Sequence, residues 1–304
     1  MRPASRSLLI LALMCLIAGP GPAQAEKTYQ RVISLYAAHT EMLLRLGARD
    51  RIIGVSGQET YQGPETAGWS PPVFTIRDDV EKYLAAKPDL ILVRPQHLAS
   101  GSQLLDTLKR SGVKVYSAQV TRADGLYKYW RELAALVGCG PEAENIILDF
   151  DRQVSAYHQA ASRRPESEQP GVFLEAIHDQ IKTFTPDSLP AWLVGLAGGR
   201  NVAEDAQPQA KGLIIAPYGP ERLLAKGAQV DIFIAQEGTM NHTPLKELKK
   251  RKIYKPLRAF KEGRIYQISE DILARPTPSL LKGLEQLAGL TGLKPDLLQG
   301  APDK

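Results

Sequence analysis

The chain has 304 residues, a formal net charge of +5 and 43% hydrophobic residues. A charge this small on a chain of this length gives no case for nucleic acid as a partner. The chain is long enough to bury one large core or two modest ones.

The first 25 residues have the pattern of a secretory signal. Arg2 and Arg6 form a basic start, residues 8–18 are apolar, and residues 23–25 read Ala-Gln-Ala, a small-x-small cleavage site. The apolar run is too short for a membrane span, which needs about 20 residues. We therefore expect an exported, soluble protein that is cleaved after Ala25.

Cleavage leaves a single cysteine and little net charge. Removal of the two arginines lowers the formal charge from +5 to +3, and Cys139 is the remaining cysteine. An intrachain disulfide is then excluded, so burial of a hydrophobic core must stabilise the fold.

Short apolar runs alternate with helical patterns along most of the chain, which predicts a mostly parallel sheet covered on both faces. The predicted strands cover residues 32–35, 52–55, 90–93, 113–116, 172–174, 230–234 and 264–266. The predicted helices cover residues 42–46, 80–86, 104–110, 189–196, 220–226 and 279–290.

The middle of the chain has a different pattern. Apolar residues recur at helical spacing from residue 126 to about residue 161, with a break at residues 138–141, and a polar stretch follows at 162–170. We assign residues 122–163 to a connecting helical segment.

The parts of the chain on either side of this segment resemble each other. Residues 81–93 parallel residues 221–234, and residues 46–52 parallel residues 196–202. A duplicated unit predicts an α/β fold with two Rossmann-like lobes, bridged by a single long helix, with a ligand cleft between the lobes. The predicted lobes are residues 26–121 and 164–304.

Four of the five histidines follow predicted strands, where ligands of open α/β sheets bind. His39 is expected at the turn before the first helix, where Thr40 alone could serve as the cap. Imidazole suits zinc, nickel, cobalt and iron, although a capping or hydrogen-bonding role is the commoner one for any single histidine in a loop. The candidate metal-facing groups are His39, His97, His178 and His242.

Aromatic and cationic residues share the same predicted loops, and flat aromatic walls with a few cations suit a large planar or anionic ligand. Ordinary loop packing or surface ion pairs are the alternative roles. The candidate ligand-binding residues are Tyr61, Trp69, Arg94, Tyr218 and Arg275.

Signals of catalysis are weak. The sequence has no GxSxG, P-loop or dinucleotide-binding motif, and Cys139 has no evident base beside it in sequence. We therefore predict a binding protein, not an enzyme, without an intrinsic cofactor.

The opening of the mature chain resembles class III periplasmic substrate-binding proteins, which serve importers of cobalamin, ferric siderophores and haem. The resemblance rests on Arg31-Val-Ile-Ser-Leu35, Thr40-Glu41 and the run from Leu46 to Val55. Val80-Glu81, Lys87-Pro-Asp-Leu-Ile91 and Glu221-Arg-Leu-Leu224 extend it. It covers roughly residues 29–290.

The resemblance implies a periplasmic, monomeric component of an ABC importer that captures a metal chelate between its lobes and delivers it to a membrane permease. It also implies that Glu81 and Glu221 pair with arginines of that permease. A plain acid at a helix start, where negative charge is favoured, is the alternative role for both residues.

Three other functions stay open at this stage. A direct binder of zinc, nickel, cobalt or iron would use the cleft histidines themselves. A sensing module would need a receptor instead of a permease. A chelatase-like enzyme that handles tetrapyrroles would show turnover and not only binding.

Overall fold

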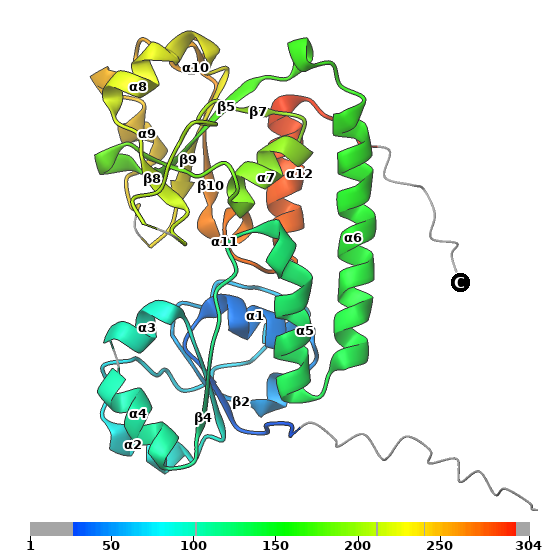
Figure 1. Cartoon of the computed structure of the whole chain (residues 1–304), viewed down its shortest axis with the longest axis vertical. Coiled ribbons are helices and arrows are strands. Elements are labelled where there is room, and N and C mark those ends of the chain that lie inside the picture. Colours follow the sequence, from blue (N-terminus) through cyan, green and yellow to red (C-terminus); the bar gives the residue numbers. More distant parts are fainter. Residues whose placement is uncertain (1–26, 101, 211, 240, 296–304) are drawn as a thin grey trace, which may run out of the picture.

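The computed structural model describes residues 27–100, 102–210, 212–239 and 241–295. The predicted signal segment, residues 1–25, lies outside the described residues. Two α/β lobes lie one above the other, and a long helix runs beside both (Figure 1). Within the described residues, no helix combines the length and apolar character that crossing a membrane requires.

The N-terminal lobe contains a four-stranded parallel sheet in the order β2-β1-β3-β4. Successive side chains of a strand face opposite sides, so Val32 packs towards helices α1 and α5 whereas Ile33 packs towards α2 and α4. The strands are β1 (Val32–Ser34), β2 (Ile52–Val55), β3 (Leu90–Val93) and β4 (Lys114–Ser117). The helices are α1 (Ala37–Arg45), α2 (Val80–Ala86), α3 (Pro95–Ser100) and α4 (Ser102–Arg110).

The C-terminal lobe contains a six-stranded mixed sheet. One of its faces packs against α7 and α12, and the other packs against α8, α9 and α10. The strands are β5 (Gly171–Ile177), β6 (Lys182–Phe184), β7 (Arg200–Asn201), β8 (Ile215–Pro217), β9 (Ile232–Glu237) and β10 (Ile265–Ser269). The helices are α7 (Leu189–Leu196), α8 (Pro220–Ala225), α9 (Leu245–Leu248), α10 (Arg258–Lys261), α11 (Glu270–Leu273) and α12 (Leu280–Thr291).

The strand order repeats between the lobes, as the internal similarity of the sequence predicts. In the second lobe β5 pairs in parallel with β7 and β9, and β9 pairs with β10. The parallel order β7-β5-β9-β10 therefore matches β2-β1-β3-β4. The antiparallel strands β6 and β8 are an addition to the second lobe that the sequence pattern did not predict.

Two antiparallel helices connect the lobes, α5 (Leu126–Val137) and the 23-residue α6 (Gly140–Ser162). Gly138 ends α5 with a φ of 65°, a left-handed conformation that glycine adopts at little cost. A single hydrophobic core extends from the first lobe through α5 and α6 into the second. The lobes consequently share buried surface.

The first helix begins earlier than the sequence pattern indicates. Helix α1 starts at Ala37 with Tyr36 as its N-cap, so His39 and Thr40 lie inside the helix instead of at the preceding turn. His97 likewise lies in α3, which was not predicted, and not in a loop. The predicted lobe boundaries fall in the connections before α5 and after α6.

Helix α12 offers a matched test of packing. A methyl group on Gly283 would lie 2.0 Å from the carbonyl oxygen of Ile272, whereas one on Gly289 would meet no atom within 4 Å. We expect Gly283→Ala to lower the free energy of unfolding by about 1–3 kcal/mol through overpacking. Gly289→Ala should raise it by up to about 1 kcal/mol, because alanine favours helix. Urea unfolding measures both, and equal effects at the two positions would contradict this packing.

Candidate functional site

A hollow of about 480 Å³ lies between the lobes. Its walls are polar and come from segments that follow β2 in the first lobe and β9 and β10 in the second, in agreement with the position of ligand sites in open α/β sheets. The lining residues are Gln58, Thr60, Glu237, Gly238, Thr239, Asn241, His242, Ser269, Glu270, Asp271 and Arg275.

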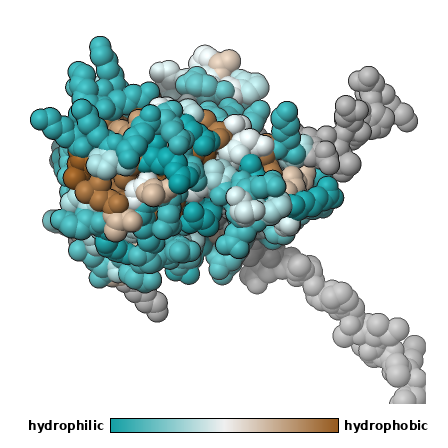
Figure 2. All heavy atoms as spheres, turned by 90° about the horizontal axis from the view of Figure 1, so that it is seen from above, coloured by the Kyte–Doolittle hydropathy of each residue, from teal (hydrophilic) through white to brown (hydrophobic). Residues whose placement is uncertain are grey.

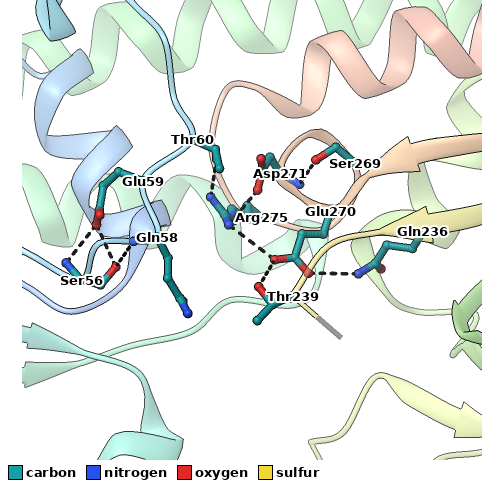
Figure 3. Close-up of polar contacts among 10 residues, drawn as sticks. All are labelled: Ser56, Gln58, Glu59, Thr60, Gln236, Thr239, Ser269, Glu270, Asp271 and Arg275. Carbon is teal, nitrogen blue, oxygen red and sulfur yellow. Dashed lines mark hydrogen bonds and ion pairs between the residues drawn. The ribbon is translucent and has the colours of Figure 1, made fainter. Parts of the chain in front are cut away.

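Arg275 joins the two walls of this hollow. Its Nη2 lies 2.7 Å from Oδ1 of Asp271 and 3.5 Å from Oε1 of Glu270, while Nη1 donates to Oγ1 of Thr60 at 2.9 Å (Figure 3). The side chain is only 11% exposed. A cation from the C-terminal lobe is thereby held against a neutral hydroxyl of the N-terminal lobe.

Glu270 has further partners within its own lobe. Its two carboxylate oxygens accept hydrogen bonds from Thr239 Oγ1 at 3.1 Å and from Gln236 Nε2 at 3.3 Å (Figure 3). These contacts tie α11 to the end of β9, so the Glu270 carboxylate beside Arg275 is itself held in place.

Tyr36, Arg94 and His97 form a second group on the N-terminal lobe. The Arg94 guanidinium lies 4.9 Å from the centre of the Tyr36 ring, and the Arg94 backbone N–H donates to Nδ1 of His97 at 3.4 Å. Burial raises the pKa of Tyr36 to about 12, and charges from both lobes act on it, including those of Arg94 and Arg275. Tyr36 therefore lies near the charged wall of the other lobe.

Two of the four predicted metal-facing histidines are buried within their own lobes. His39 has no exposed surface, its Nε2–H donates to the Ala118 carbonyl at 3.1 Å, and its ring packs against Tyr36 and Tyr129. His178 is 1% exposed. Neither ring reaches the hollow between the lobes, which corrects the predicted position of both.

The other two histidines are more accessible. His242 is exposed and lines the hollow, and His97 is partly exposed in α3. Within the described residues, no group of three or more His, Cys, Asp or Glu side chains is arranged to hold a metal ion. A metal-facing role for His97 or His242 stays a prediction.

The predicted aromatic residues do not form one wall. Tyr218 is 4% exposed and packs on Phe173 in the core of the C-terminal lobe, which corrects its predicted place in the cleft. Tyr61 and Trp69 line a different hollow of about 260 Å³ beside α1. Of the five predicted ligand-binding residues, Arg275 is the one that lines the hollow between the lobes, and Arg94 lies in the group beside Tyr36.

Glu81 and Glu221 occupy equivalent positions in the two lobes. Each is exposed and lies in the first turn of its helix, α2 and α8 respectively, where a carboxylate interacts favourably with the helix dipole. The two helices lie at opposite ends of the molecule (Figure 1). Neither carboxylate forms an ion pair with any other described residue.

Several residues at or beside this site were not among the predicted site residues. Tyr36 lies two residues after the end of β1 and Glu270 follows β10 directly, so the rule that ligands meet the carboxyl ends of strands could have found both. Gln58 and Thr60 could have been found in the same way, after β2.

Comparison with known proteins agrees with the fold. A family model described as "Periplasmic binding protein" matches residues 32–272. A vitamin B12-binding protein of Vibrio vulnificus is 26% identical over 288 residues, which are 92% of this chain and 94% of that protein. An uncharacterized ABC transporter substrate-binding lipoprotein of Bacillus subtilis is 23% identical over 267 residues, 86% of this chain and 80% of that protein.

A solved structure shows the same architecture. It is that of a possible iron-binding, periplasmic solute-binding protein of Staphylococcus epidermidis, with a TM-score of 0.72 and 25% identity, and it covers 87% of this chain and 99% of that chain. The chain belongs to the periplasmic binding protein family. The resemblance on which the sequence analysis relied is thus confirmed, as is the two-lobed α/β fold.

Burial of His39 predicts a dependence of stability on pH. Desolvation lowers the pKa of His39 to about 3, so the folded ring stays neutral while the unfolded ring gains a proton below its ordinary pKa of about 6.5. Stability contributed by the neutral ring is present above pH 6.5 and is lost as the pH falls. Between pH 7 and pH 5 we expect the free energy of unfolding to decrease by about 2 kcal/mol from this group.

His39→Gln should remove that decrease. The glutamine side-chain N–H can still donate to the Ala118 carbonyl, but the amide does not titrate. Urea unfolding at several pH values measures it, with the exposed His158→Gln as the matched control. If His39→Gln lost as much stability between pH 7 and pH 5 as the native protein, His39 would not be the source of the pH dependence.

Proposed function

We propose that this protein is the periplasmic solute-binding component of an ABC importer and that it captures a metal chelate between its lobes for delivery to a permease. The observation that carries the proposal is the hollow between the lobes, which is lined by charged and polar groups from both of them. Its family and the names of its relatives, a vitamin B12-binding protein among them, support the same function.

The hollow is lined by the carboxylates of Glu237, Glu270 and Asp271 as well as by Arg275, so anionic groups of a ligand would bind locally, at Arg275 and at Arg94 beside it. Arg94 and Arg275 come from opposite lobes, and the Tyr36 ring beside Arg94 offers a flat surface. Arg275 donates one N–H to the neutral hydroxyl of Thr60. A ligand carboxylate or phosphate can take that donor without leaving a buried charge unpaired.

Burial of His39 and His178 favours a chelate held mainly by its organic shell over a bare ion held by four histidines. A ferric siderophore, haem or cobalamin meets this description. His242, or His97, would serve as an accessory group towards the metal. We propose binding without turnover, by a monomer located in the periplasm.

Replacement of Arg275 in the hollow, or of Arg94 beside Tyr36, should weaken ligand binding. Arg275→Gln and Arg94→Gln each remove a charge-assisted hydrogen bond of about 1.5–3 kcal/mol, which corresponds to about a ten- to hundred-fold increase in Kd. Fluorescence titration with haemin, cyanocobalamin and a ferric siderophore measures the change for whichever of them binds the native protein.

Arg152→Gln is the matched control, because Arg152 is exposed on α6. Its Kd should equal that of the native protein. If Arg275→Gln and Arg94→Gln also retained the native Kd, the proposed role of the two arginines would be wrong.

Charge reversal at the two exposed glutamates should separate binding from delivery. Glu81→Lys and Glu221→Lys leave the cleft intact, so we expect an unchanged Kd together with slower uptake in cells that carry the importer. Glu142→Lys is the matched control, since Glu142 is also exposed in the first turn of a helix. Native uptake by both variants would exclude Glu81 and Glu221 from docking.

A further inference from the structure

Basic residues are concentrated in one stretch of the C-terminal lobe. Residues 245–264 contain nine lysines and arginines and two glutamates, a net charge of +7, whereas the whole chain carries +5. The remainder of the chain is therefore slightly acidic, and the excess positive charge of this protein belongs to one segment.

The fold turns this segment into a cationic surface. It contains α9, the 3-10 helix η7 (Lys252–Tyr254) and α10, and its apolar residues Leu248, Tyr254 and Leu257 are fully buried against the core. The basic side chains are left on the outside. The exposed ones are Lys246, Lys249, Lys250, Lys252, Lys255, Arg258 and Lys261.

Most of these charges have no ion-pair partner. Lys250 pairs with Glu247 at 2.8 Å and Arg258 pairs with Asp231 at 2.5 Å. The other five lysines form no ion pair with any described residue, and we call these five the basic face. They are Lys246, Lys249, Lys252, Lys255 and Lys261.

The basic face lies beside the helix that carries one of the proposed docking glutamates. Helices α8, α9 and α10 lie together at the end of the C-terminal lobe that is farthest from the N-terminal lobe (Figure 1), and they pack on one shared core. Figure 2 views this end of the molecule and shows mostly hydrophilic side chains around small apolar patches. Ile253 of η7 and Leu224 of α8 are each 37% exposed.

We propose that the basic face binds the anionic headgroups of phospholipids. Unpaired lysines attract a negatively charged bilayer through many weak contacts without fixed geometry, and exposed apolar side chains among them favour the interfacial region. A protein partner with paired acidic groups would be matched better by arginine, whose planar guanidinium binds carboxylates in two places at once. The inference rests on the proposed function in one respect, because docking on a membrane permease would bring the protein close to a bilayer.

Vesicle co-sedimentation tests the proposal without the permease. The full mature chain is mixed with vesicles of phosphatidylcholine alone or with phosphatidylglycerol, at low and high salt. We expect binding only to the anionic vesicles, and loss of this binding at about 0.5 M salt, where charges are screened beyond a few Å. Lys249→Gln, Lys252→Gln and Lys255→Gln combined should weaken binding about a hundred-fold, since each lysine near an anionic surface contributes about five-fold.

The control is a second triple variant, Lys114→Gln, Lys282→Gln and Lys294→Gln, which removes the same charge from exposed positions outside the basic face. It should bind anionic vesicles within a few-fold of the native protein. Absence of binding to anionic vesicles, or equal loss in both triple variants, would overturn the proposal. A third outcome would also overturn it. If the variant with Lys249→Gln, Lys252→Gln and Lys255→Gln bound vesicles like the native protein but bound the purified permease in detergent more weakly, the partner of the basic face would be an acidic protein surface. Failure of these tests would leave ligand binding in the cleft unaffected, so it is distinguishable from failure of the proposed function.

Discussion

A buried carboxylate that is shared between the lobes fixes the geometry on which the cleft depends. The Ser279 hydroxyl, at the start of α12, donates to Oε1 of Glu41 at 2.6 Å, and Arg45 Nε donates to the same oxygen at 2.8 Å. Nearby, the Trp130 indole N–H donates to the Pro276 carbonyl at 2.8 Å. A buried charge is costly without its partners, so these bonds hold the segment before α12 firmly on the N-terminal lobe.

The position of the proposed ligand groups follows from this attachment. Arg275 lies directly before the fixed segment, and for this reason a cation of the C-terminal lobe reaches Thr60 of the other lobe. The core that continues through α5 and α6 limits how far the lobes can separate. We infer small movements on ligand capture, with Glu81 and Glu221 kept at a nearly constant separation, as recognition by a single permease would require.

The sequence predicted the fold better than the site. Strand periodicity and the internal repeat located the parallel strands other than the two-residue β7, and they located the connecting helical segment, because these depend on local patterns of apolar residues. The burial of His39 depends on contacts with Ala118 and Tyr129, which lie about 80 or 90 residues away in sequence, so position after a strand could not reveal it. Tyr218 was misplaced for the same reason, since its burial follows from packing on Phe173.

The central claim is that the cleft carries a whole metal chelate, and a native mass spectrum tests it most directly. The mature protein would be purified from the periplasm of its own organism, and its native and denatured masses would be compared alongside its visible absorbance. The account predicts an added mass equal to a complete siderophore, haem or corrinoid, with the matching absorbance. An added mass of a single metal ion, lost on replacement of His97 and His242, would contradict it.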